Sequence, residues 1–307
     1  MEDTDADRTA AQKSGPAETR KTIRNPIEWL WDEVVLAART VGSARHGLHD
    51  IREHLHSPPP AVRRIGGAEL KEVLAKGYDD FGAYRTDVIF LCVIYPIVGL
   101  VLARVAFGEG MLPLLFPLAS GFALVGPFAA VGLYEMSRER EQGVDVSWAN
   151  AFGVVRSPAF GGVLLLGLLL VVIFLVWLGM AQVIYNATLG PEPPASAAAF
   201  VRDVFTTGAG WAMIVVGVGV GFLFAVASMA ISVVSFPLML DRNVGLDTAL
   251  TTSVRAVAAN PVPMALWGLI VAGGLVIGSL PLFIGLIVVM PVLGHSTWHL
   301  YRKLVPR

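Results

Sequence analysis

Two histidines near the C-terminal end of the sequence are spaced so that both could bind one ligand. His295 and His299 are four residues apart and therefore share one face of a helix. Two imidazoles placed this way could bind a metal ion or contribute to a haem site. Trp298, Tyr301 and Arg302 lie beside them, and such rings and cations are also typical of an anchor where a helix meets lipid headgroups. The sequence favours the interfacial anchor, with a partner or lipid contact and a metal or haem site as alternatives.

A second group of histidines lies nearer to the N-terminus and could hold a divalent metal. His46, His49 and Glu53 would share a helix face, and imidazole and carboxylate groups are common metal ligands. Their spacing matches no known metal motif, so a solvated helix explains the same residues. We therefore predict no cofactor from either histidine group.

Charged residues gather where two of the apolar runs end. Glu135 and Arg138 follow the second run, and Asp241 and Arg242 follow the fourth, in comparable places. This placement favours a cluster of ion pairs between two similar units. A functional vestibule is the alternative.

Small residues form a ridge along the fourth apolar run. Gly217, Gly221 and Ala225 recur at intervals of four residues, and Ser228 and Ser232 can extend the ridge. Such ridges let transmembrane helices approach closely, and serine hydroxyls can donate hydrogen bonds across the contact. Helix packing is therefore the favoured interpretation over the lining of a pore.

Several classes of function find no support in the residues. The middle of every apolar run is free of Asp, Glu, Lys and Arg, which normally mark ion paths and proton relays. There is no nucleophile elbow, phosphate-binding loop or HExxH zinc motif. The formal net charge of −1 gives no basic field for nucleic acid. We therefore expect a protein without catalytic machinery, whose environment is the lipid bilayer.

The elements that must position these residues are apolar helices. Ala256–Tyr301 holds 46 residues without one charged side chain, which as a single helix would reach about 70 Å. A bilayer core is only about 30 Å thick, so two spans are expected, with the break at Gly278–Pro281. The fold class is thus all-α, a polytopic transmembrane helical bundle. We expect six spans, at about 88–107, 111–134, 160–186, 210–238, 262–279 and 282–301.

An internal repeat organises these spans. Gly143 and Asp145 match Gly245 and Asp247 at one offset of 102 residues, as do the apolar positions that follow each pair. Both Asp residues are placed to act as N-caps of amphipathic helices. Residues 68–84 show a third amphipathic pattern. We expect three repeats, each an amphipathic helix followed by two transmembrane helices.

Charge bias near the span ends predicts the topology. With six spans, 11 Lys and Arg residues lie near the spans on one side and 2 on the other. Because basic loops stay in the cytoplasm, both termini are expected there, in a bacterial inner membrane. Residues 1–60 are polar and are expected to be largely disordered, ending in the proline-rich linker Ser57–Pro60. Residues 61–305 form the expected helical membrane domain.

Four segments of the chain are similar to a known family. They are Ser57–Ile65, Gly126–Glu135, Met239–Arg242 and Gly294–Arg302. They resemble DUF2189, a family of predicted bacterial integral membrane proteins without an assigned function, over about residues 57–305. The resemblance implies a location in the bacterial cytoplasmic membrane and supplies no catalytic residues.

Three hypotheses for function follow. The first is a non-enzymatic scaffold, accessory subunit or lipid-interacting factor, with a membrane-protein partner or a second copy of the chain as possible partners. The second is a transporter or channel built from repeated two-span units. The third is a metal- or haem-binding membrane subunit that uses His295 and His299.

Overall fold

The computed structural model describes residues 60–108 and 111–307. Within these residues the chain is built from helices and contains no strand, which confirms the all-α fold class. The α-helices are α3 (Gly67–Ala83), α4 (Arg85–Cys92), α5 (Ile94–Gly108), α6 (Leu115–Ala129), α7 (Val131–Glu141), α8 (Phe160–Thr188), α9 (Ala197–Thr206), α10 (Gly208–Ser232), α11 (Ser235–Arg242), α12 (Leu246–Ala259), α13 (Pro261–Ser279) and α14 (Leu286–Leu304). Two 3-10 helices join them, η1 (Leu112–Leu114) and η2 (Trp148–Arg156).

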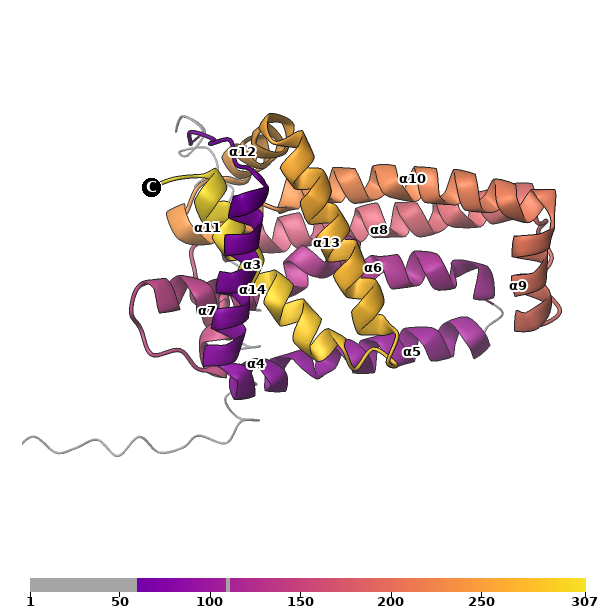
Figure 1. The fold of residues 1–307 in the computed structure, drawn as a ribbon, viewed down its shortest axis with the longest axis horizontal. Helices are drawn as coiled ribbons and strands as arrows, with labels where there is room; N and C mark the ends of the chain where they lie inside the picture. The colour runs from indigo at the N-terminus through magenta and orange to yellow at the C-terminus, as the bar shows by residue number, and fades with distance from the viewer. Residues whose placement is uncertain (1–59, 109–110) are drawn as a thin grey trace, which may run out of the picture.

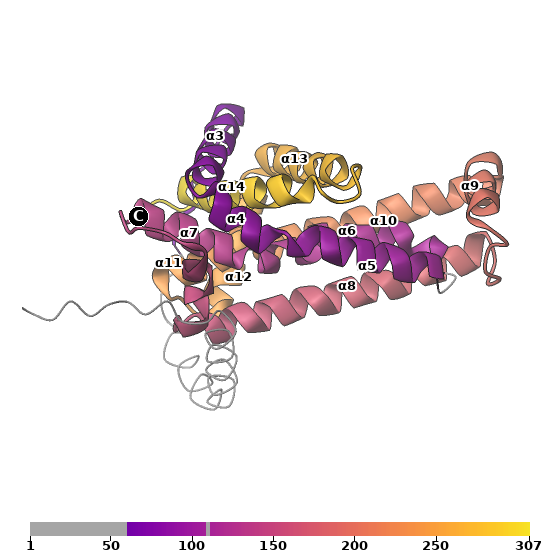
Figure 2. The same cartoon turned by 90° about the horizontal axis from the view of Figure 1, so that it is seen from below.

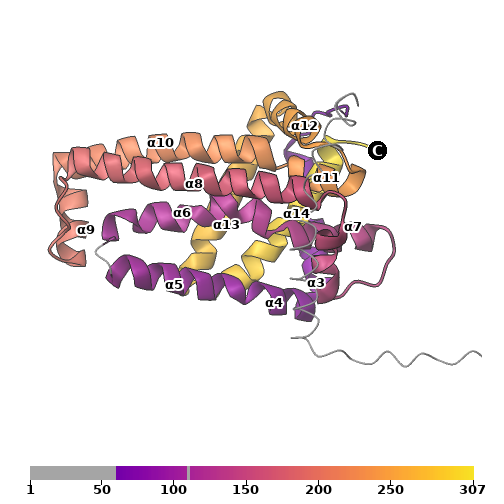
Figure 3. The same cartoon turned by 180° about the vertical axis from the view of Figure 1, so that it is seen from behind.

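Four helices lie along the long axis of the molecule, and we call α5, α6, α8 and α10 the bundle (Figures 1 and 3). α6 packs on α8, and α8 packs on α10. Helix α9 lies across one end of the bundle. At the other end lie α3, α7, α11, α12 and residues 294–307, which we call the head. The backbone N–H of Arg63 donates to the carbonyl of Leu304 at 2.8 Å, so the segments near the two ends of the described chain meet in the head.

Five stretches of the described chain are long and apolar enough to cross a membrane. They are Arg85–Arg104, Leu112–Glu141, Phe160–Thr188, Gly208–Arg242 and Pro261–Ser279. These match the first five predicted spans in position. The sixth predicted span, 282–301, is not among them. Its helix α14 carries polar and charged residues through its second half, and of these His295, Ser296 and Thr297 are buried against other parts of the protein.

Helices α13 and α14 form a hairpin at the predicted break. α13 ends at Ser279, and Leu282 and Phe283 adopt left-handed backbone conformations, with φ of 52° and 65°. The Phe283 ring lies so close to Gly99 that a Cβ there would be 2.5 Å from it. Gly99 is in the interior of α5, so the hairpin turns beside the middle of the bundle and not at the α9 end (Figures 1 and 2).

The order of elements follows the predicted repeat, but its helix caps differ. α3, η2 and α12 each precede a pair of longer helical segments. Ser147 is the N-cap of η2 and forms a capping box with Asn150, while Gly245 is the N-cap of α12. The prediction that Asp145 and Asp247 are N-caps is therefore wrong. Asp247 lies in the first turn of α12, where a negative charge still favours the helix dipole.

Candidate functional site

The head is held together by a close crossing of α3 and α14. A Cβ built on Gly77 would lie 2.0 Å from Ser296 Oγ and 2.7 Å from the Ser296 backbone nitrogen. Only glycine therefore permits this approach. The crossing brings the next turn of α3, with Asp80, against the side of α14 that carries both C-terminal histidines.

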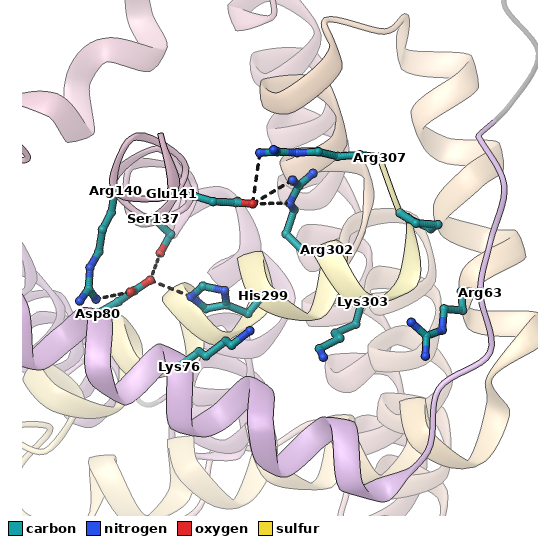
Figure 4. A pocket seen from close by; sticks show the side chains of 11 residues that line it. Arg63, Lys76, Asp80, Ser137, Arg140, Glu141, His299, Arg302, Lys303 and Arg307 are labelled. Carbon is teal, nitrogen blue, oxygen red and sulfur yellow. Dashed lines mark hydrogen bonds and ion pairs between the residues drawn. The ribbon is translucent and has the colours of Figure 1, made fainter. Parts of the chain in front are cut away.

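Asp80 is the centre of a buried network that joins α3, α7 and α14 (Figure 4). Its side chain is only 7% exposed. Asp80 Oδ2 accepts a hydrogen bond from Ser137 Oγ at 2.6 Å and one from His299 Nε2 at 2.9 Å. Asp80 Oδ1 pairs with the guanidinium of Arg140. Burial by itself raises the pKa of Asp80, but the hydrogen bonds from His299 and Ser137 outweigh it, so the pKa lies below its usual value.

His295 completes this network from a fully buried position. Its Nδ1 lies 2.8 Å from Ser137 Oγ. Because the Ser137 hydroxyl donates its one proton to Asp80, His295 Nδ1 must carry the proton that it donates to Ser137. His295 Nε2 then has a free lone pair, and it is buried without a hydrogen-bond partner among the described residues. Burial lowers the pKa of His295 to about 4, so the ring is neutral at pH 7.

A second network lies one turn further along α14. Glu141 accepts hydrogen bonds from Trp298 Nε1 at 3.1 Å and from Arg302 Nη2 at 2.9 Å. Asp241 accepts from the Tyr301 hydroxyl at 2.6 Å and from Arg302 Nη1 at 3.0 Å. Arg302 thus bridges α7 and α11. Trp298 and Tyr301 are 0% exposed, so packing inside the protein describes them and an interfacial anchor does not.

The predicted cluster at the ends of the second and fourth runs lies in the head, as two local groups. Glu135 pairs with Arg138 on the same turn of α7, at 2.8 Å from Arg138 Nε. Arg242 Nη2 donates to the carbonyl of Pro306 at 2.5 Å, and its Nε lies 3.7 Å from Asp241. The first pair therefore stays within α7, and the second group ties the last residues of the chain to α11.

The small-residue ridge on α10 is only partly used for packing. A Cβ on Gly221 would lie 3.0 Å from the Trp177 ring of α8, whereas one on Gly217 would meet nothing within 4 Å. Ala225 is exposed. Ser228 Oγ donates to the carbonyl of Leu124 on α6 at 2.8 Å, which confirms the predicted hydrogen bond across a helix contact.

A pocket of about 590 Å³ opens beside Asp80, between α3, α7 and the end of α14 (Figure 4). Its wall includes two carboxylates, Asp80 and Glu141, together with Ser137, His299 and Pro306. Six basic side chains complete it: Arg63, Lys76, Arg140, Arg302, Lys303 and Arg307. The pocket is therefore a polar, predominantly cationic site at the head end of an apolar bundle.

One ring nitrogen of each C-terminal histidine is engaged within the protein. His299 presents Nε2 to Asp80, and His295 presents Nδ1 to Ser137. Among residues 60–108 and 111–307, no three or more His, Cys, Asp or Glu side chains are arranged to hold a metal ion. The N-terminal candidates His46, His49 and Glu53 lie outside the described residues.

Asp80 and Ser137 are central to the site, and sequence reasoning missed both. The signal for Asp80 is its place on α3, where Leu70, Val73, Gly77 and Asp80 recur on the buried face. A charged residue on such a face requires a partner from another element. Ser137 carried no comparable signal.

Comparisons with known proteins give one finding of similarity. No curated protein and no solved structure matches the chain. A family model does match, over less than half of the 307 residues and from α6 to the end of α11. Of the resembling segments, Gly126–Glu135 and Met239–Asp241 lie inside the matched range, whereas Ser57–Ile65 and Gly294–Arg302 lie outside it. The family that the chain matches, over residues 115–241, is DUF2189, described as a predicted integral membrane protein.

Proposed function

We propose that this protein acts without catalysis, as a lipid-interacting factor of the bacterial inner membrane, with its head in the cytoplasm. The observation that carries the proposal is the cationic pocket at the head end of a bundle whose long helices expose apolar side chains. Phe222 and Leu223 on α10 are each 65% exposed, and a bilayer supplies the surroundings that such surfaces need. Basic side chains next to a bilayer attract acidic lipids.

The buried network contains a serine, a histidine and an aspartate, the residue types of a hydrolase active site, but its geometry supports a structural role for them. Ser137, His295 and Asp80 lie together, but they are only 2%, 0% and 5% exposed, so most of the surface of each is packed against other parts of the protein. The Ser137 proton is donated to Asp80 and not to His295, which is the wrong arrangement for a nucleophile with its general base. These residues fasten three helices to one another.

The distribution of basic residues supports the orientation. The 11 basic residues counted near the spans on one side of the membrane all lie on head elements or next to them, from α3 to Arg307. Arg104 and Arg202 lie toward the α9 end, on α5 and α9. The positive-inside rule then assigns the head to the cytoplasm.

Lipid enrichment tests the proposal directly. The full chain would be extracted from bacterial membranes in native nanodiscs, and its co-purified lipids quantified by mass spectrometry against the bulk membrane. We expect acidic phospholipids to be enriched around the protein. Bulk lipid composition, together with specific solute flux through the protein reconstituted alone, would contradict the proposal and favour a transporter. Reporter tags at residue 307 and in the loop 189–196 test the orientation, because they should report opposite sides of the membrane.

A further inference from the structure

We infer that the cationic pocket of the head binds a phosphate group, carried by an acidic phospholipid or by a small soluble phosphate, through Arg63, Lys76 and Lys303. This inference rests on the proposed function, because it names the group that the head would recognise.

The two carboxylates of the pocket wall are already engaged by protein donors. Asp80 is bonded to Ser137, His299 and Arg140, and Glu141 accepts from Trp298 and Arg302. Their negative charge is therefore matched locally, within α3, α7 and α14. Arg307 also donates to Glu141, at 3.2 Å. The other basic side chains of the wall, Arg63, Lys76 and Lys303, pair within the described part of the chain only with carboxylates that do not line the pocket.

The positive charges of Arg63, Lys76 and Lys303 outnumber the carboxylates that pair with them. Lys76 and Lys303 both pair with one carboxylate, that of Glu72, at 3.0 Å and 2.7 Å. Arg63 lies 3.9 Å from Glu69, a loose pair. Hydrogen bonds from Lys303 and Lys76 lower the pKa of Glu72 to about 2, as expected where cations outnumber the carboxylates beside them.

The same side chains are accessible to a ligand. The side chains of Arg63 and Lys76 are 60% and 49% exposed, and that of Lys303 is 25% exposed. All three lie along the junction of α3 and α14, with Arg63 and Lys303 directed toward the same space (Figure 4). Arg307, at 71% exposure, faces the pocket from the other side of α14.

The backbone that carries Arg63 is fixed before any ligand binds. Its N–H donates to the carbonyl of Leu304, and its carbonyl accepts from Asn260 Nδ2 at 3.1 Å. Asn260 Oδ1 also accepts from the backbone N–H of Ile65 at 2.8 Å. A preformed backbone reduces the entropy lost on binding, which is typical of built sites.

The chemistry of these groups favours phosphate over a single carboxylate. An arginine fork and lysine ammonium groups together satisfy three or four oxygen atoms, which a phosphate offers and one carboxylate does not. The volume of about 590 Å³ is larger than a phosphate ion and suits a headgroup or a small phosphorylated molecule.

Binding to the full chain in phosphatidylcholine nanodiscs tests the inference. Inorganic phosphate and glycerol 3-phosphate would be titrated by calorimetry, and nanodiscs doped with phosphatidic acid would be examined by native mass spectrometry. The test variant is R63Q/K303Q. The matched control, K71Q/R255Q, removes the same charge from exposed residues of α3 and α12 that do not line the pocket.

We expect the test variant to bind the preferred probe at least tenfold more weakly than wild type, and the control to bind as wild type does. R63K/K303R, which keeps both charges, should retain most of the binding. Preference for phosphatidic acid identifies a lipid ligand, and preference for glycerol 3-phosphate identifies a soluble one. Equal loss in test and control variants, unchanged binding in the test variant, or absence of binding to every probe would overturn the inference.

Failure of this inference and failure of the proposed function give different results. If native nanodiscs are enriched in acidic lipids and R63Q/K303Q leaves that enrichment unchanged, the pocket is not the site and the lipid-interacting function stands. If phosphate binds in the pocket and no lipid is enriched, the site stands and the lipid function fails. Thermal unfolding of every variant checks that the head remains folded.

Discussion

The head and the bundle solve the problem of helix association in opposite ways. In the most apolar window of the α10–α11 span, only 6% of the residues are buried, so most of its apolar side chains face outward. In α14, by contrast, every residue from Gly294 to Trp298 is buried, and most of its polar groups are bonded to other helices or to its own backbone. Lipid tails solvate apolar side chains about as favourably as a neighbouring helix does. Apolar contact alone therefore determines only weakly which helices of the bundle pack together. The head fixes its helices through buried groups that have defined partners.

Loss of the central carboxylate, Asp80, should reduce the stability of the head more than any other single change. D80N removes the charge that Arg140 and His299 face in the head. Removing one partner of a buried ion pair costs about 3–5 kcal/mol of unfolding free energy, and the partial exposure of Arg140 favours the lower value. Thermal unfolding in detergent, followed by circular dichroism, would measure it. The control D79N alters an exposed neighbour on the same helix and should change stability by less than about 0.5 kcal/mol.

Acid should destabilise the head through His295. Its pKa is about 4 in the folded protein and about 6.5 when unfolded, so the unfolded chain binds more protons between these values. Stability from this group is fully present above pH 6.5 and falls by roughly 3 kcal/mol as the pH drops to 4. Urea unfolding at a series of pH values would show this slope. H295Q should flatten it between pH 6.5 and 4, and an unchanged slope would contradict the assignment. Protonation of Asp80, whose pKa is lowered, adds a further loss below its ordinary value of 3.8.

Two glycine substitutions compare how tightly helices pack in the head and in the bundle. G77A places a Cβ against the backbone of α14 and should cost about 1–3 kcal/mol, because the two helices must move apart. G217A on α10 meets open space and should be neutral or slightly stabilising, since alanine favours a helix. Unfolding temperatures of the two variants in one detergent would decide. Equal losses would mean that the bundle packs as strictly as the head.

The smallest effect is expected within the bundle. S228A removes the hydrogen bond to the Leu124 carbonyl between α10 and α6. Single hydrogen bonds between membrane helices contribute about 0.6 kcal/mol on average. S232A, whose hydroxyl donates within its own helix to Ser228, should cost less than S228A. Denaturation in mixed micelles resolves differences of this size when both variants are compared in parallel.

The overall fold was predictable because apolar length constrains it directly. The five spans and the break near Pro281 follow from uncharged runs that must fit a bilayer. The sixth predicted span is not among these stretches, because absence of formal charge is a poor guide for α14. His295, Ser296 and Thr297 carry no charge and are nevertheless polar, and the structure buries them in protein contacts.

The site was less predictable because its partners are far apart in sequence. Asp80 and Ser137 are 57 residues apart, and Ser137 and His295 are 158 apart, so helical periodicity relates none of them. Periodicity identifies the buried face of α3 but not the residue that will meet it. The pocket depends on Arg63 and Lys303, which come together only when the first and last described segments join.

The short hairpin of α13 and α14 affects how the protein fits a curved bilayer. Because α13 and α14 turn beside Gly99, the half of the molecule near the head is wider than the half near α9 (Figures 1 and 2). Such a wedge displaces more lipid from one leaflet than from the other, so it fits best where the bilayer is convex on the head side. Sorting between vesicles of small and large radius would measure this preference for curvature.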